Sequence, residues 1–239
     1  MAWPDKKAHF MQIVRTQQTL ADQVYEAILA WIEDGRYGPD DRLIQEEIAE
    51  KLGVSRQPVQ QALLLLRNKG VLINAPGRGL MIAPLDEDKV RDMYEIRASL
   101  DALASGKAAE RGAARARAEG MAIIERGWQA VKSNVISELI AADMDFHHFV
   151  YELSGNQMIV ETVAPNWTYL RRVIGEALTN GVSASEVWKQ HEEIMQAIAD
   201  GDIEKAKQLT YRHIELAGTK VIEKLSEEAS DDKKMKTVG

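Results

Sequence analysis

The sequence contains no cysteine among its 239 residues, which excludes disulfide bonds and thiolate metal sites. It also contains no uninterrupted apolar run near the ~20 residues that a membrane-spanning helix needs. Residues 1–18 carry several basic side chains but no apolar signal core. These absences favour a cytoplasmic protein that has no membrane partner.

Positive charge is also scarce, since 30 lysines and arginines face 37 aspartates and glutamates, which gives a net charge of −7. An acidic balance of this kind opposes binding to nucleic acids. The acidity is confined to the C-terminal part, however, because residues 1–85 contain equal numbers of acidic and basic side chains. The neutral N-terminal part can therefore still present a local basic face to phosphates.

The sequence does contain helical periodicity along most of its length. It predicts a mainly α fold, with an N-terminal winged helix-turn-helix that includes a small β-hairpin and a C-terminal all-α bundle of six or seven helices. The expected division is a flexible arm at 1–18, a winged helix-turn-helix domain at 19–84, a linker at 85–88, a helical domain at 89–226 and a disordered tail at 227–239.

The first domain combines three short helical patterns, at about 19–34, 44–52 and 56–69, with two apolar runs around the glycine-rich segment 76–79. Gly53 can adopt the positive φ that ends the second helix. This order of helices, followed by a hairpin with glycines at its tip, is typical of a winged helix-turn-helix.

Side chains that can read DNA lie at the start of the third helix. Ser55 is a favoured N-cap. The polar side of the helix then carries Arg56, Gln57, Gln60 and Gln61. Arginine hydrogen-bonds to guanine and glutamine to adenine, and a recognition helix reads bases with its N-terminal residues. Arg78 at the hairpin tip can approach a minor groove or a phosphate. Single glutamines are usually only solvated surface, but the whole arrangement favours DNA binding.

The motifs of this region include Leu52-Gly53-Val54-Ser55-Arg56, Pro58-Val59, Ala62-Leu63 and Gly77-Arg78-Gly79. They resemble the GntR family of bacterial regulators. From the side-chain chemistry and the resemblance together, we expect DNA contacts from Arg42, Ser55, Arg56, Gln57, Gln60, Gln61, Gly77, Arg78 and Gly79. The chain departs from the family at Glu46, where arginine is usual, and at Gln60-Gln61, where arginine-glutamate is usual. We therefore expect weaker phosphate binding and an altered base preference.

The C-terminal part offers a candidate metal site. Asp143 and His147 are four residues apart, which places them on one face of a helix. His191 and His213 lie on two later helices among apolar neighbours. One carboxylate and three imidazoles can bind Zn²⁺ or a similar ion. Spacing alone leaves open that each histidine is only a core or surface residue.

Further motifs in this part are Glu95-Ile96-Arg97, Leu100-Asp101, Phe146-His147, Ser154-Gly155-Asn156, His191-Glu192-Glu193-Ile194 and Gly201-Asp202. They resemble the ligand-binding domain of FadR-type regulators, called FCD. The resemblance implies a divalent metal, zinc first and nickel, manganese or iron as alternatives, on Asp143, His147, His191 and His213. It also places Arg97 in the cavity, where it could bind the carboxylate of an effector or form a structural salt bridge with Glu95 or Asp101.

The sequence thus predicts a ligand-responsive transcription regulator. It would bind a double-stranded DNA operator as a homodimer, repress transcription and take a small organic or sugar acid as effector. A second hypothesis makes the metal ion itself the signal. A metal-dependent hydrolase is disfavoured, because Met195 stands at the second ligand position of an H-E-x-x-H pattern. We therefore expect no enzymatic activity.

Overall fold

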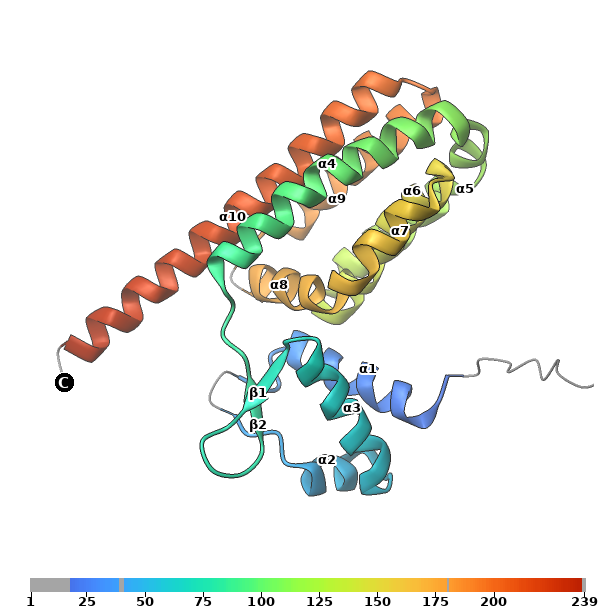
Figure 1. Ribbon diagram of the computed structural model, residues 1–239. Helices are drawn as coiled ribbons and strands as arrows, with labels where there is room; N and C mark the ends of the chain where they lie inside the picture. Colours follow the sequence, from blue (N-terminus) through green and yellow to red (C-terminus); the bar gives the residue numbers. More distant parts are fainter. Residues whose placement is uncertain (1–17, 39–40, 180, 238–239) are drawn as a thin grey trace, which may run out of the picture.

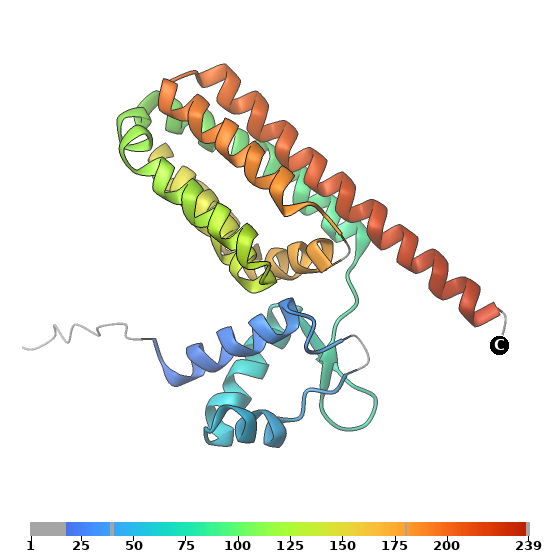
Figure 2. The same ribbon diagram turned by 180° about the vertical axis from the view of Figure 1, so that it is seen from behind.

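The computed structural model describes residues 18–38, 41–179 and 181–237, which form two bodies joined by one connecting segment (Figure 1 and Figure 2). Helices dominate both bodies, and in the described residues the sheet consists of two strands. This confirms the predicted mainly α fold. The predicted flexible arm at 1–18 lies outside the described residues except for its last position.

The smaller body is the N-terminal domain. Its elements are α1 (Leu20–Glu33), α2 (Gln45–Leu52), α3 (Arg56–Asn68), β1 (Leu72–Asn74) and β2 (Leu80–Ile82). One continuous apolar core joins the three helices to the hairpin. The arrangement is the winged helix-turn-helix that the sequence predicts.

Local chemistry sets the boundaries of these helices. A capping box begins α1, in which the Thr19 hydroxyl accepts a hydrogen bond from the Asp22 amide at 3.1 Å. Gly53 ends α2 with a φ of 64°, as a left-handed cap. Ser55 occupies the N-cap of α3, but its side chain makes no capping hydrogen bond. The Ser55 hydroxyl is therefore not committed to the helix.

The hairpin forms the wing. Its antiparallel strands pair Leu72 with Ile82, and both side chains are buried. Gly77 and Gly79 flank Arg78 with φ values of 90° and 96°. Side chains rarely tolerate these backbone conformations, so the tip needs glycine on both sides of its arginine.

The larger body is a bundle of seven α-helices within the described residues, as predicted. They are α4 (Glu87–Arg111), α5 (Ala113–Ser133), α6 (Ile136–Ser154), α7 (Gln157–Val163), α8 (Trp167–Thr179), α9 (Ala184–Asp200) and α10 (Ile203–Thr237), with one 3-10 turn at Ala164–Asn166. The two longest, α4 and α10, run side by side along one face of the bundle (Figure 1 and Figure 2).

Two helix ends differ from the expected boundaries. The linker was expected at 85–88, but α4 already begins at Glu87, because the Asp86 side chain accepts a hydrogen bond from the Lys89 amide at 3.1 Å. The tail was expected to be disordered at 227–239, yet α10 continues to Thr237. Its charged composition suggested disorder, but lysine, glutamate and alanine are good helix formers and the segment lacks glycine and proline before its last residue.

Close helix packing in the bundle makes one glycine difficult to replace. A Cβ at Gly127 of α5 would lie 1.9 Å from the ring of Trp188, which is 1% exposed. Gly127→Ala is expected to lower the free energy of unfolding by about 3 kcal/mol in urea titrations, because a buried indole must move. Gly106→Ala is the control, since the side chain it would meet is that of the flexible Lys207. Equal stability of both variants would contradict this packing.

The two bodies meet where α1 lies against α8. Arg171 donates from Nε to Glu33 Oε1 at 2.8 Å and from Nη1 to Glu26 Oε2 at 2.6 Å. The hydroxyls of Tyr25 and Thr168 lie 2.7 Å apart in the same contact. Glu33 is only 3% exposed, so this ion pair is largely shielded from water. The contact ties the position of α1 to that of α8.

Candidate functional site

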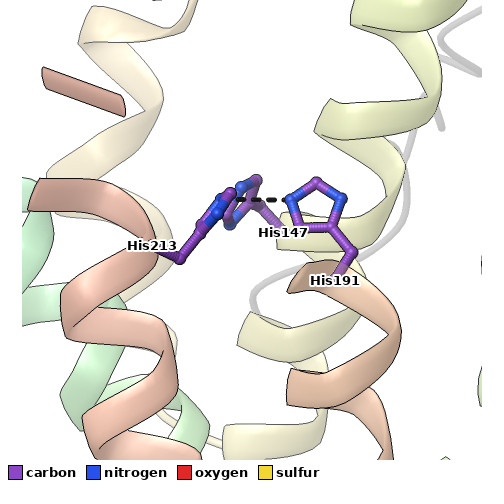
Figure 3. A group of neighbouring side chains, drawn as sticks. All are labelled: His147, His191 and His213. Atoms are coloured by element: carbon purple, nitrogen blue, oxygen red, sulfur yellow. Dashed lines mark hydrogen bonds between the residues drawn. The ribbon is translucent and has the colours of Figure 1, made fainter. Parts of the chain in front are cut away.

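Three histidines converge inside the helical bundle, each from a different helix. His147 comes from α6, His191 from α9 and His213 from α10, and Figure 3 shows their rings facing one another. One ring nitrogen of each lies within 4.8 Å of the others, and the Nε2 atoms of His191 and His213 are 3.1 Å apart. All three side chains are buried. Segments far apart in sequence thus bring three potential ligands to one point.

Asp143 lies beside this histidine cluster. Its Oδ1 is 3.5 Å from His191 Nε2, and its Oδ2 is 3.9 Å from His147 Nε2. The four residues that the sequence singled out therefore lie together. His148, the fourth histidine of this part, is exposed on α6 and packs its ring edge-on against Trp167 instead.

Neighbouring side chains orient two of the rings. Gln190 Oε1 lies 2.7 Å from His213 Nδ1, so that nitrogen carries the proton and donates to the amide oxygen. Asp101 Oδ2 lies 3.4 Å from His147 Nδ1 and favours the same tautomer there. Both rings then turn an unprotonated Nε2 toward the cluster. The sequence alone did not predict this role for Gln190 or Asp101.

Burial keeps the histidines uncharged. It lowers the pKa of His147 and His191 well below the usual value, and it lowers the pKa of His213 to about 3, with the positive charge of Arg97 acting in the same direction. Burial also raises the pKa of Asp143 to about 6. Neutral imidazoles are the form that binds metal ions.

Unsatisfied polar atoms decide whether these side chains fit a metal ion. Within the described residues, buried Asp143 Oδ2 and His147 Nε2 have no hydrogen-bond partner. Such buried acceptors are costly unless something fills the space between them. A divalent cation would satisfy both, and three imidazoles with one carboxylate are a common set for zinc. The residues present therefore fit a metal ion of this kind.

A cavity of about 70 Å³ opens next to the histidine cluster. Its polar lining includes Arg97, Asp143, His147 and His213, and its apolar lining includes Ile174 and Leu178 of α8. A polar end with an apolar wall suits a ligand that joins an anionic group to an apolar part.

The surroundings of Arg97 bear on both roles that the sequence left open, the structural salt bridge and the binding of an effector. Its Nε is 3.2 Å from Asp101 Oδ2, and Asp101 also accepts a hydrogen bond from the Tyr151 hydroxyl. The structural ion pair is therefore present. Its Nη2, however, is buried without a hydrogen-bond partner among the described residues. Part of the guanidinium thus remains able to bind an anion in the cavity.

Most of the side chains expected to contact DNA are exposed on the N-terminal domain. The exposed positions include Arg42, Ser55, Arg56, Gln57, Gln60, Gln61, Gly77 and Arg78, and Gly79 is half-buried. Arg42 Nη1 donates to the carbonyl oxygen of Arg78 at 3.0 Å and so holds the wing tip. Gln60 shares a surface groove with Arg78. The start of α3 and the wing are therefore adjacent.

Comparison with known proteins agrees with this architecture. Residues 20–82 match the family described as bacterial regulatory proteins, gntR family, and residues 92–216 match the FCD domain. The chain belongs to the GntR family. It is 30% identical over 182 residues to an HTH-type transcriptional regulator in an unstable DNA locus of Streptomyces ambofaciens, covering 74% of each chain. It is 25% identical over 229 residues to the Uxu operon transcriptional regulator of Escherichia coli, covering 86% of this chain and 89% of the relative.

Solved structures support the GntR fold. The match to E. coli McbR/YncC has a TM-score of 0.71 at 21% sequence identity. It covers 87% of this chain and 99% of the McbR/YncC chain. A GntR regulator from Rhodococcus sp. RHA1 has a TM-score of 0.67 and 21% identity, over 84% of this chain and 97% of its own. Like its relatives, this GntR protein is a transcription regulator and not an enzyme. None of the helices in the described ranges combines the length and hydropathy of a membrane span.

Proposed function

We propose that this GntR regulator represses transcription as a homodimer and responds to a small organic or sugar acid that binds beside a divalent metal ion. Arg42, Ser55, Arg56, Gln57, Gln60, Gln61, Gly77, Arg78 and Gly79 would contact double-stranded DNA. Asp143, His147, His191 and His213 would hold the ion, with zinc as the first candidate. The observation that carries the proposal is that two members of the histidine cluster, His147 and His213, line the same cavity as Arg97, whose Nη2 has no hydrogen-bond partner among the described residues.

When bound, the ion would supply a Lewis-acidic partner for an effector carboxylate. Arg97 would hold a second part of the anion, because a guanidinium forms two parallel hydrogen bonds to a carboxylate. The lining of Ile174 and Leu178 excludes water from the rest of the ligand. The volume of about 70 Å³ favours a small acid over a fatty-acyl ligand.

Helix α8 provides a route from the cavity to DNA. Ile174 and Leu178 line the cavity, while Arg171, one turn earlier, binds Glu33 of α1. An effector that fits one position of α8 better than another would therefore bias the position of the N-terminal domain. In a homodimer this would change the spacing of the two recognition helices and hence operator affinity.

Exposed apolar side chains support the homodimer. Ile96 and Leu103 are seven residues apart on one face of α4 and are 61% and 41% exposed. Apolar patches on a soluble protein commonly mark an interface. Light scattering of the full chain is expected to give the mass of a dimer, and a monomer at micromolar concentration would contradict this part of the proposal.

The experiment that tests effector binding uses an operator obtained by in vitro selection. Fluorescence anisotropy then measures operator affinity at fixed salt while a panel of small carboxylates and sugar acids is added. At least one acid is expected to weaken operator binding. Arg97→Lys retains the positive charge but loses the bidentate geometry, so it is expected to weaken that response about tenfold or more. A panel without effect on the wild type would overturn the acid effector.

The alternative, a regulator whose signal is the metal ion, is supported by the joining of α6, α9 and α10 at one point. It predicts that chelation changes operator affinity without any acid present. If operator affinity stays the same after chelation at fixed salt, the ion is not the signal.

A further inference from the structure

The surface proposed to face DNA contains an acidic residue that holds two of its cations. Glu46 Oε1 lies 2.9 Å from Arg78 Nη2 at the wing tip and 3.4 Å from Arg56 Nη1 at the start of α3. One carboxylate of α2 thus bridges the wing and the recognition helix. These two arginines are the most exposed members of the bridge, at 79% and 70% for their side chains.

We propose that Glu46 limits sequence-independent binding to DNA by competing with phosphates for Arg56 and Arg78. The inference rests on the DNA-facing surface assigned above and names a residue that sets its selectivity. A carboxylate and a phosphate oxygen bind the same face of a guanidinium, so each arginine must leave Glu46 before it can contact the backbone. The displaced carboxylate then repels the phosphates around it.

The solvent exposure of the Glu46 ion pairs decides how strongly they can oppose DNA binding. Ion pairs open to solvent are weak, so the bridge does not block the surface permanently. It instead removes much of the attraction that any duplex offers, since sequence-independent binding depends on phosphate contacts. Contacts to base edges from glutamines such as Gln60 are uncharged and do not suffer this competition. Discrimination between sequences should therefore be higher with the carboxylate than without it.

The chain supplies a matched control for this role. Glu46 and Glu47 both lie in the first turn of α2, where negative charge is favoured by the helix dipole. Glu47 is exposed, and within the described part of the chain no ion pair to it is found. Glu46→Gln and Glu47→Gln thus remove the same charge from the same helix turn, but only the first releases the two arginines.

The test measures the affinity of full-length protein for a fluorescent duplex pool of random sequence. Glu46→Gln is expected to bind about tenfold more tightly at low salt, because a competing charge is removed next to the phosphates. The slope of log affinity against log salt should steepen by about 1 to 2, because each recovered phosphate contact adds about 0.9. Glu47→Gln should change the affinity by less than about twofold, because more distant exposed charges are screened.

A double-mutant cycle shows whether Glu46 acts through the arginines. In an Arg78→Gln background, the gain from Glu46→Gln should be smaller than in the wild type, since one of its partners is gone. If Glu46→Gln and Glu47→Gln show equal affinities and equal salt slopes, the inference is overturned. The assignment of the DNA-facing surface still holds in that case when Arg56→Gln weakens binding. If the Arg56→Gln variant binds DNA as well as the wild type, both the surface assignment and the inference fail. Thermal melts confirm that each variant is folded.

Discussion

Replacing His147 with alanine is expected to abolish metal binding, whereas replacing His148 with alanine leaves it intact. The two histidines are adjacent on α6, but only His147 lies in the buried cluster. Mass spectrometry of the metal content should give about one ion per chain for the wild type and for His148→Ala, because one set of three imidazoles and one carboxylate holds one ion. His147→Ala should contain almost none.

The same pair of variants should differ in thermal stability. An ion present at a thousandfold excess over its dissociation constant stabilises the folded state by about 4 kcal/mol. For a chain of this size that corresponds to a rise in Tm of about 10 °C. Chelation should therefore lower the Tm of the wild type and of His148→Ala by this amount and leave His147→Ala unchanged. A wild type that purifies without any divalent ion, and whose Tm does not respond to added zinc, would refute the metal site.

Replacing Arg171 with glutamine is expected to separate the two bodies of the protein. The change leaves the buried carboxylate of Glu33 without its ion-pair partner, and a buried unpaired charge costs about 3 kcal/mol. Urea titrations should show this loss, and hydrogen exchange should show faster exchange across α1. Effector binding in the bundle should then no longer change operator affinity, because the link between α8 and α1 is lost.

The decrease in the free energy of unfolding caused by Arg171→Gln should depend on pH. Burial raises the pKa of Glu33, and Arg171 opposes that rise. Without Arg171 the folded-state pKa rises further above the unfolded value. The penalty is therefore fully present above the raised folded-state pKa of Glu33 and shrinks as the pH falls through that pKa, because the carboxyl group then takes up its proton.

Two further variants serve as controls for this contact. Arg115→Gln removes an exposed ion pair with Glu119 and should leave the urea midpoint nearly unchanged. Replacing both Arg171 and Glu33 with methionine should recover much of the lost stability, because neither charge is then left buried alone. If Arg171→Gln is as stable as Arg115→Gln, the contact does not hold the domains together.

Local sequence signals predicted much of the fold. The alternation of apolar positions and the caps at Thr19 and Gly53 depend on neighbouring residues, so they can be read without tertiary structure. The end of α10 differs from the expected tail because charged composition and helix propensity point in opposite directions there. The start of α4 differs from the expected end of the linker because Asp86 caps the helix.

The candidate site was predictable in its ligand types but not in its surroundings. The i,i+4 spacing of Asp143 and His147 places them on one helix face whatever the tertiary fold. The contacts of Asp101 and Gln190 with the rings come from the packing of α4, α9 and α10 and leave no periodic signal. Glu46 stood out in sequence only as a missing arginine, and its bridge between wing and helix required the three-dimensional arrangement.

The placement of the histidines on α6, α9 and α10 has a consequence for biosynthesis. A ribosome makes α6 well before α10, so a nascent chain holds Asp143 and His147 for some time without His213 to complete the set. The same last helix is the long neighbour of α4, the first helix of the bundle (Figure 1). Under the proposed metal site, the bundle and its set of ligands would therefore both become complete only after α10 is made.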